Sequence, residues 1–191
     1  MSDNILSMTQ TRSIMYMHLT SDSRFRMDYH MHDRFEIYFV VSGTVDFFVE
    51  RSVYTVEPGD LMVINSHEIH KSSWQSDKEY ERIIVEFDPG ILAPFCSSDY
   101  NLLGCFTQRP KGQHNRIRLE PAQIQELNGL YRNFERLGEN PSAGADLLRL
   151  TYLTELLVFV NDAFSASNQA GRRRKMPAKL LPILDYIDNN L

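Results

Sequence analysis

Short runs of alternating apolar and polar residues dominate the chain up to about Phe87. Val45, Phe47 and Val49 alternate with more polar neighbours, which predicts a strand with one buried face. Seven such runs, rich in β-branched and aromatic residues, are separated by turn formers: SIMYMHL, FRMDY, EIYFVV, TVDFFVE, VYTV, DLMVI and YERIIVEF. Because no helical stretch lies between them, they predict a sandwich or barrel closed largely by antiparallel pairing.

The periodicity becomes helical in the second half of the chain. The stretch over 88–116 is predicted to be a packed, irregular loop. Apolar residues then recur at helical spacing from Pro121 to Gly138. Proline is common in the first turn of a helix and glycine at its end, so these two residues mark the predicted bounds. A second helix is predicted over 142–164, and it is apolar around most of its circumference. Such a helix needs cover on two sides. The barrel or the first helix supplies one side, and the other side suggests a partner subunit. Burial wholly within the monomer is the alternative.

Two flanking segments complete the predicted organisation. Residues 1–11 are polar and predict a mobile N-terminal arm, although their few apolar residues could fold back over the body. Residues 165–176 are small and polar and then basic, which predicts a linker. In 177–191 apolar residues recur at helical spacing, but one amphipathic helix cannot bury its apolar face alone. This last segment therefore predicts the first helix of a further domain.

Composition narrows the class of protein. The 191 residues carry a net charge of −5, which argues against a nucleic-acid surface on this part of the protein. No apolar run reaches the roughly 18–20 residues that span a bilayer, and the N-terminus lacks the basic-then-apolar order of a secretory signal. The two cysteines, Cys96 and Cys105, are not spaced as a metal-binding pair and are too few for a disulfide framework. We therefore expect a cytoplasmic protein with reduced thiols, a disulfide between the two being the minor alternative.

Four histidines fall within one stretch, and two of them are spaced for metal binding. On an extended chain His30 and His32 point to the same face, with Cα atoms about 6.6 Å apart. That spacing lets two ring nitrogens reach one metal at about 2.1 Å each. Glu36 can join them only if the chain turns at 33–34, and His70 must come from a different strand.

This spacing resembles the cupin family, whose first motif is His-x-His, three or four residues, Glu, six residues and Gly. The matching residues are His30, His32, Glu36 and Gly43 in the first motif, and Gly59 and His70 in the second. The second motif is partial, because Asn65, His67 and Trp74 stand where Pro, Gly and Asn are usual. The resemblance implies a small β-barrel of jelly-roll type in which His30, His32, Glu36 and His70 bind one divalent metal.

The order of the parts resembles the AraC/XylS family of transcription regulators. The resemblance rests on HMHDRFEIYFVVSG, EPGDLMVINSHEIH, the two predicted helices and ILDYIDNN. It implies a mainly β fold with C-terminal α: a cupin-like effector-binding barrel over 12–116 and an antiparallel helix pair within the dimerisation segment 117–164. It further implies a homodimer through the helices at 121–164, and DNA binding only through a C-terminal helix-turn-helix domain that these residues lack.

Three interpretations of the histidine cluster stay open. The side chains could bind Zn²⁺, Ni²⁺, Fe²⁺ or Mn²⁺, hydrogen-bond an organic effector directly, or be satisfied polar groups without a ligand. For an effector such as a sugar or a small aromatic compound, Tyr38 and Phe47 are expected to face the barrel interior, and Trp74 to wall its mouth. Plain core packing is the alternative for all three. Arg24, Arg26 and Arg34 could meet an acidic effector, although solvated surface charge is the simpler interpretation.

A metal-dependent cupin enzyme, either a dioxygenase or an isomerase, is the alternative function. Two histidines and a carboxylate around iron leave coordination positions for oxygen and substrate. The additional linker and helix and the partial second motif favour the regulator, because a free-standing enzyme needs neither. The sequence therefore predicts a ligand sensor that is not an enzyme.

Overall fold

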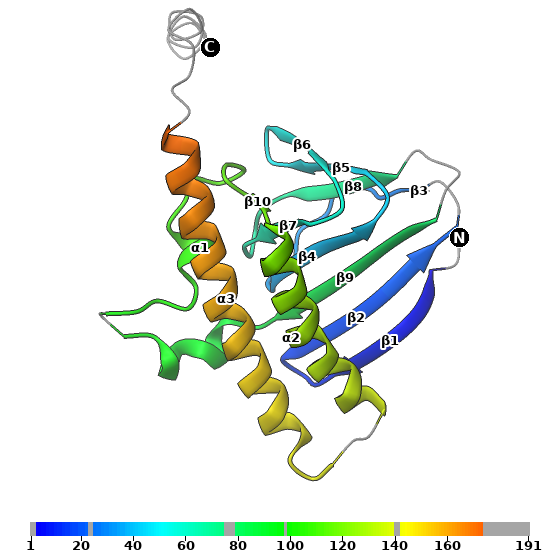
Figure 1. The fold of residues 1–191 in the computed structure, drawn as a ribbon, viewed down its shortest axis with the longest axis vertical. Helices are drawn as coiled ribbons and strands as arrows, with labels where there is room; N and C mark the ends of the chain where they lie inside the picture. The colour runs from blue at the N-terminus through cyan, green and yellow to red at the C-terminus, as the bar shows by residue number, and fades with distance from the viewer. Residues whose placement is uncertain (1–2, 23–24, 75–78, 98, 140–141, 174–191) are drawn as a thin grey trace, which may run out of the picture.

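A computed structural model describes residues 3–22, 25–74, 79–97, 99–139 and 142–173. Two antiparallel sheets form a barrel, and a pair of long helices packs beside it (Figure 1). The larger sheet contains, in spatial order, β1 (Asn4–Gln10), β2 (Ile14–Ser21), β9 (Tyr80–Phe87), β4 (Phe35–Ser42), β7 (Asp60–Ile64) and β10 (Arg116–Arg118). The smaller sheet contains β3 (Phe25–Arg26), β8 (His70–Trp74), β5 (Val45–Val49) and β6 (Ser52–Val56). The fold is a cupin-like jelly-roll barrel followed by helices, as the sequence predicted.

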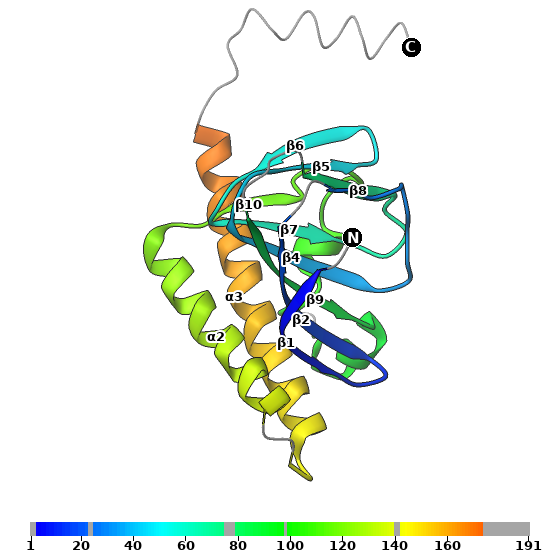
Figure 2. The ribbon, with the colours of Figure 1, turned by 90° about the vertical axis from the view of Figure 1, so that its right-hand side faces the viewer.

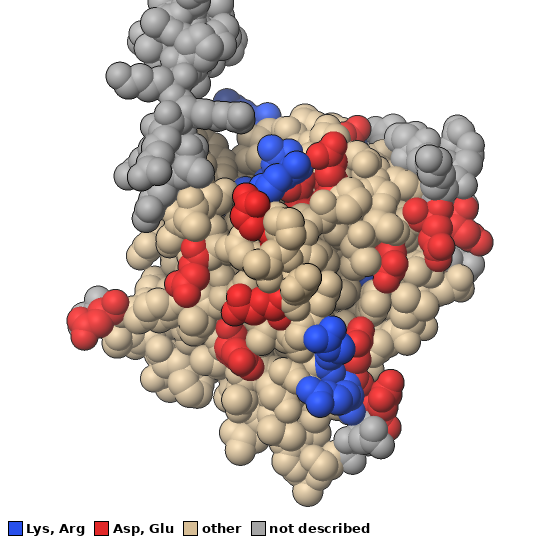
Figure 3. Space-filling view, in the orientation of Figure 1, with Lys and Arg blue, Asp and Glu red and all other residues tan. Residues whose placement is uncertain are grey.

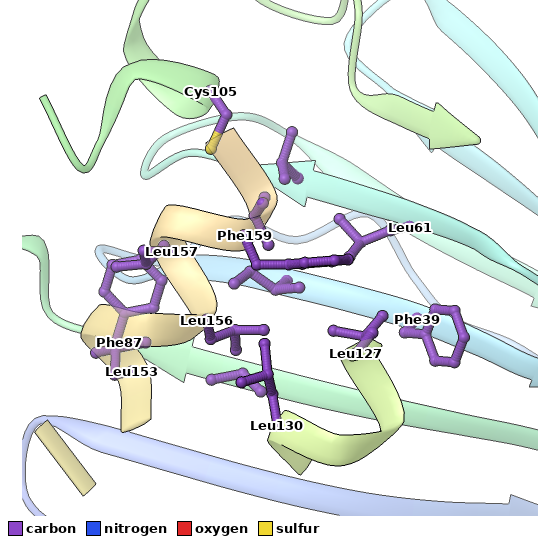
Figure 4. Packing of buried hydrophobic residues seen from close by; sticks show 14 of the residues in the cluster. Phe39, Leu61, Phe87, Cys105, Leu127, Leu130, Leu153, Leu156, Leu157 and Phe159 are labelled. Carbon is purple, nitrogen blue, oxygen red and sulfur yellow. The ribbon is translucent and has the colours of Figure 1, made fainter. Parts of the chain in front are cut away.

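The helices cover the outer face of the larger sheet (Figure 2). A short 3₁₀ segment (Pro89–Phe95) and α1 (Gly104–Thr107) precede the antiparallel pair α2 (Pro121–Glu139) and α3 (Ala145–Arg173). Leucines from both long helices pack on aromatic and aliphatic side chains of the sheet (Figure 4). The cluster between the helices and the larger sheet is the larger of two buried hydrophobic clusters. It is large because α2 and α3 each bury one apolar face against the strands.

Strand β4 separates the two clusters. Successive side chains of a strand point to opposite faces, and on β4 Ile37 and Phe39 join the cluster under the helices, whereas Tyr38 and Val40 join the cluster between the two sheets. All four are buried. The barrel interior therefore lies one sheet thickness away from the helices.

Residues 4–10 form an edge strand, so the prediction of a mobile arm is wrong for these residues, and the alternative that the segment folds back over the body holds. Strand β1 pairs with β2 from Asn4 opposite Thr20 to Gln10 opposite Met15. It is also tied to the helix pair, because the Nε of Arg149 on α3 donates a 2.7 Å hydrogen bond to the Oγ1 of Thr9. Strand β10 was likewise missed by the sequence patterns, whereas β8 is the separate strand that a shared site required for His70, although no apolar run marked it.

Helix α3 continues nine residues beyond the predicted end at residue 164, so the linker prediction over 165–176 is wrong for 165–173. The remaining linker residues and the predicted helix over 177–191 lie outside the described residues. None of the described helices is long and apolar enough to cross a membrane. Cys96 and Cys105 are free thiols. Acidic and basic side chains are interspersed on the face that carries the helices (Figure 3).

Candidate functional site

Three histidines meet at one end of the barrel because two backbone features bring their segments together. An isolated antiparallel bridge joins His30 to His70, with N–O distances of 3.0 and 2.9 Å in the two directions. The chain bends at residues 33–34, and strand β4 begins directly afterwards. This bend turns Glu36 back toward His32, and the distance from His32 Nε2 to Glu36 Oε2 is 3.2 Å. The turn that the sequence required for a shared site is therefore present.

The imidazoles are oriented by backbone carbonyl groups. The Nδ1 of His30 lies 3.1 Å from the carbonyl oxygen of Asp28, and that of His32 lies 3.0 Å from the oxygen of Arg34. The Nδ1 of His70 lies 2.8 Å from the oxygen of Glu68. A carbonyl oxygen accepts only, so each Nδ1 carries the proton in these bonds. Each ring therefore leaves its Nε2 as the nitrogen available to a ligand, an arrangement typical of metal-binding histidines.

The ligand-type atoms of these residues converge. One such atom from each of His30, His32 and His70 lies within 4.8 Å of the others, and the same holds for His32, Glu36 and Glu86. His70 is 2% exposed, and its Nε2 has no hydrogen-bond partner within the described residues. The nearest carboxylate oxygen, Oε2 of Glu36, is 3.6 Å from that nitrogen. A buried polar atom without a partner is costly, and a ligand at this point would satisfy it.

The two carboxylates give the site a negative potential. Burial by itself would raise the pKa of Glu36, but the neighbouring imidazoles of His32 and His70 outweigh it and lower the value to about 2. Burial and the neighbouring Glu36 charge both raise the pKa of Glu86. The hydrogen bond to Glu36 raises the pKa of His32. A cation would relieve the repulsion between the two carboxylates.

This donor set fits a divalent transition metal. Imidazole nitrogens and carboxylate oxygens are the ligands that Zn²⁺, Ni²⁺, Fe²⁺ and Mn²⁺ share. The predicted residues His30, His32, Glu36 and His70 are brought together, and Glu86 is an additional carboxylate beside them. His67, in contrast, lies on the loop before β8 with 61% of its side chain exposed.

A cavity of about 310 Å³ extends from this cluster into the barrel. Its lining residues are Asp3, Met17, Leu19, Met27, His30, Glu36, Tyr38, Phe47, His70, Ser72, Arg82, Ile84 and Glu86. The rings of Tyr38 and Phe47 meet edge to face with centroids 5.0 Å apart, and Phe47 stacks against His70. The predicted inward orientation of these two aromatic residues agrees with the cavity lining.

A model of one protein family matches residues 15–157, which is well over half of the 191 residues. Its description is the AraC-like ligand-binding domain. The chain belongs to this family. No curated protein matches this AraC-like domain.

Solved structures that resemble this AraC-like domain include cupin barrels at low identity. A Cupin 2 conserved barrel domain protein from Salinispora arenicola is 15% identical over 49% of this chain and 80% of its own, with a TM-score of 0.40. TT1209 from Thermus thermophilus is 15% identical over 45% and 83%, with a TM-score of 0.41. A variant salicylate 1,2-dioxygenase from Pseudoaminobacter salicylatoxidans is 19% identical over 44% and 24%, with a TM-score of 0.38.

Trp74 does not wall the cavity mouth of the AraC-like domain, so that prediction is wrong. Its side chain is 2% exposed and stacks on Tyr80 with ring centroids 4.8 Å apart. It packs under the turn at Gly43, where φ is +87° and an added Cβ would lie 2.8 Å from Cη2 of Trp74. The tryptophan is therefore a core residue that supports a tight turn.

Three charged residues that line the cavity of this AraC-like domain were missed by the sequence patterns: Asp3, Arg82 and Glu86. Arg82 and Glu86 lie on the same face of β9 as Ile84. Two charged residues on one face of an otherwise buried strand are the sequence feature that could have pointed to a polar cavity. Of the arginines proposed for an acidic effector, Arg34 donates to the carbonyl of Arg12 on the surface, Arg24 lies outside the described residues, and the side chain of Arg26 is not described.

Proposed function

We propose that this chain is the effector-sensing part of an AraC-type transcription regulator. In this proposal the barrel binds a small organic molecule beside a divalent metal held by His30, His32, Glu36 and His70. The metal would act as a Lewis acid that holds an oxygen atom of the effector. Tyr38 and Phe47 would pack against the body of the molecule. Regulation would pass to a C-terminal DNA-binding domain outside the described residues.

The orientation of the three imidazoles is the observation that carries the metal assignment. Histidines with only a structural role have no reason to share one tautomer and to expose Nε2 toward a common point. Here all three Nδ1 atoms are held by carbonyl oxygens, and the buried Nε2 of His70 has no partner within the described part of the chain. A metal bound by all three imidazoles would satisfy the free Nε2 of His70, which supports a metal rather than direct hydrogen bonds to an effector.

Elemental analysis of the protein, purified without an affinity tag, tests this assignment. We expect near-stoichiometric metal in the wild type and its loss in the double variant His30→Ala/His32→Ala. His67→Ala is the matched control, because it removes a histidine on the exposed loop next to the site. Equal metal content in the double variant would refute the site. No metal in any sample would leave the cavity as a purely organic effector pocket.

The exposed face of α3 supports a homodimer, as expected for this family. Leu147 and Val158 are 69% and 40% exposed, and Phe95, which lines the same groove, is 48% exposed. Large apolar side chains that cluster on one face mark interaction surfaces more often than chance exposure does. We infer that a second copy of the chain covers this stripe, which places two sensing barrels in one assembly.

A metal-dependent enzyme is the second candidate function. Its support is Glu86, a half-buried carboxyl beside the histidine cluster whose pKa is raised by burial and by the charge of Glu36, since a carboxyl with a raised pKa can accept and donate a proton. Oxygen uptake by the Fe²⁺-loaded protein with small aromatic acids tests it. Turnover that falls in Glu86→Gln but not in the exposed variant Glu57→Gln would favour the enzyme, whereas binding without turnover would favour the sensor.

A further inference from the structure

Arg82 places a buried positive charge at the other end of the cavity. It lies on β9 with 6% of its surface exposed, four residues before Glu86 on the same face of the strand. At about 3.3 Å per residue, the two Cα atoms are separated by roughly 13 Å. The cavity therefore has two polar ends: the histidine cluster at one and a guanidinium group at the other.

The charge of Arg82 is paired with the N-terminal end of the described chain. Its Nη2 donates a 2.8 Å hydrogen bond to Oδ2 of Asp3, and its Nη1 donates one of 2.8 Å to Oγ of Ser21. Ser21 in turn donates to the other carboxylate oxygen of Asp3. The Asp3 side chain is 37% exposed, whereas that of Arg82 is 7% exposed. The carboxylate thus reaches the buried guanidinium from the solvent side.

The wall between the two polar ends is apolar. Met17, Leu19, Tyr38, Phe47 and Ile84 line this part of the cavity. A volume of about 310 Å³ corresponds to roughly ten water molecules at about 30 Å³ each, enough for an organic molecule of about ten to fifteen non-hydrogen atoms. A molecule that fills it needs an apolar body and polar groups at its ends.

We propose that the effector is a small organic anion with an apolar body, and that its carboxylate replaces Asp3 on Arg82. The inference rests on the proposed sensing function and names the ligand class for the same cavity. A neutral group in place of Asp3 would leave a buried charge unpaired, which is strongly unfavourable. An anion preserves the pair and fits the planar, forked donors of the guanidinium group. Asp3 is therefore an internal competitor for the effector.

Displacement of Asp3 would also reach the helices. Asp3 directly precedes β1, and the other end of that strand carries Thr9, which accepts the hydrogen bond from Arg149 on α3. Effector binding would thus exchange a contact at one end of β1 while the other end remains fixed to the helix that we propose for dimerisation. The strand gives the cavity a direct connection to that helix.

Matched acids and amides test the ligand class. We would measure binding of acetate, hexanoate, benzoate and phenylacetate, and of the corresponding neutral amides, by calorimetry and thermal shift. We expect the larger carboxylates to bind and to raise the melting temperature, and the amides to bind at least about tenfold more weakly, since a charge-assisted hydrogen bond contributes about 1.5 kcal/mol or more.

Variants of the ion pair complete the test. Asp3→Asn removes the competitor, and we expect carboxylates to bind it about tenfold more tightly than the wild type. Asp46→Asn is the control, because it removes the same charge from the outer face of β5. Arg82→Gln should lose carboxylate binding, and Arg82→Lys should keep part of it with the same preference over amides. Amides that bind as well as acids, or an Asp3→Asn protein without carboxylate binding, would overturn the proposal.

The titrations can refute the metal site and the proposed ligand class independently of each other. Each titration is run on chelator-treated and on Zn²⁺-loaded protein. Zinc binding without any carboxylate binding would refute the proposed ligand class and would still support the metal site. Carboxylate binding that depends on Arg82 and ignores Zn²⁺ would support the inference and count against the metal as part of the effector site.

Discussion

Glu68 and Arg109 form a buried, doubly hydrogen-bonded ion pair directly behind the histidine cluster. Both carboxylate oxygens lie 2.7 Å from guanidinium nitrogens, and the two side chains are 0% and 1% exposed. Glu68 also accepts hydrogen bonds from the backbone of Asn65 and Gly112. Because the carbonyl oxygen of Glu68 orients His70, the pair fixes the loop on which the site depends.

Replacement of Glu68 by Gln should therefore strongly destabilise the protein. The substitution leaves Arg109 buried without an anion, and removal of one partner of a buried pair costs about 3–5 kcal/mol. Urea denaturation measures the change in the free energy of unfolding. Glu57→Gln is the control, because it removes one partner of the solvent-exposed pair with Arg118 and should cost at most about 1 kcal/mol. Equal effects of the two variants would contradict this role.

Stability should depend on pH in opposite ways with and without metal. Burial alone would lower the pKa of His70, but Glu36 outweighs it, and the pKa values of His32 and His70 are both raised above 6.5. Protonated imidazoles thus contribute stability that is present below pH 6.5 and is lost as the pH rises through the folded values. Metal requires neutral imidazoles, so metal-loaded protein should gain stability over the same range.

Thermal unfolding at pH 6 and pH 8 checks this prediction in chelator-treated and Zn²⁺-loaded samples. Between pH 6 and pH 8, the chelator-treated wild type should lose more stability than the chelator-treated Glu36→Gln variant. The variant lacks the carboxylate that raises the pKa values of both histidines. Parallel pH profiles for chelated and Zn²⁺-loaded protein would contradict it.

The apolar stripe on α3 should control the oligomeric state. Leu147→Glu and Val158→Glu place charges on the surface that we assign to a second copy, and both should convert dimer to monomer at micromolar concentration. Light scattering after size-exclusion chromatography measures the mass. Val53→Glu is the control, because Val53 is 61% exposed on β6, away from the helices. A wild-type monomer would refute the interface.

Gly43 should tolerate no side chain. Its φ of +87° disfavours any other residue, and an added Cβ would meet Trp74 at 2.8 Å. We expect Gly43→Ala to lower the free energy of unfolding by about 1–3 kcal/mol. Gly144→Ala, where nothing lies within 4 Å of the added atom, is the control and should be nearly neutral. Similar midpoints of urea denaturation would contradict the packing argument.

The strands that the sequence predicted are short runs rich in β-branched and aromatic residues and bounded by turn formers, and YERIIVEF matches β9 residue for residue. Strand β8, HKSSW, was required for His70 but was not marked by any apolar run, because four of its five buried residues are polar or charged. Edge strand β1 was missed because most of its residues are exposed. Helix α3 can run past residue 164 because the residues that follow include no proline, and Gly171, the weakest helix former among them, lies only two residues before the end of the helix.

His30 and His32 were predictable because their spacing is local in the sequence, whereas Glu36 and His70 were placed beside them by the resemblance to the cupin motifs. Arg82 and Asp3 were not predictable, because their pairing depends on which strands are neighbours: β1 adds to β2, and β2 lies beside β9. Sequence order gives no direct measure of that adjacency. The arginines nominated instead were chosen for nearness in sequence to His30, and proximity along the chain is a poor guide to a cavity built from several strands.

The alternation along β4 also bears on how a domain of this kind can diversify. Residues that face the effector cavity and residues that support the helices are interleaved on one strand but never share a side of it. Substitutions at Glu36 or Tyr38 can therefore change what the cavity accepts while Ile37 and Phe39 keep the helices in place. Effector choice and helical architecture can vary independently, one face of the strand at a time.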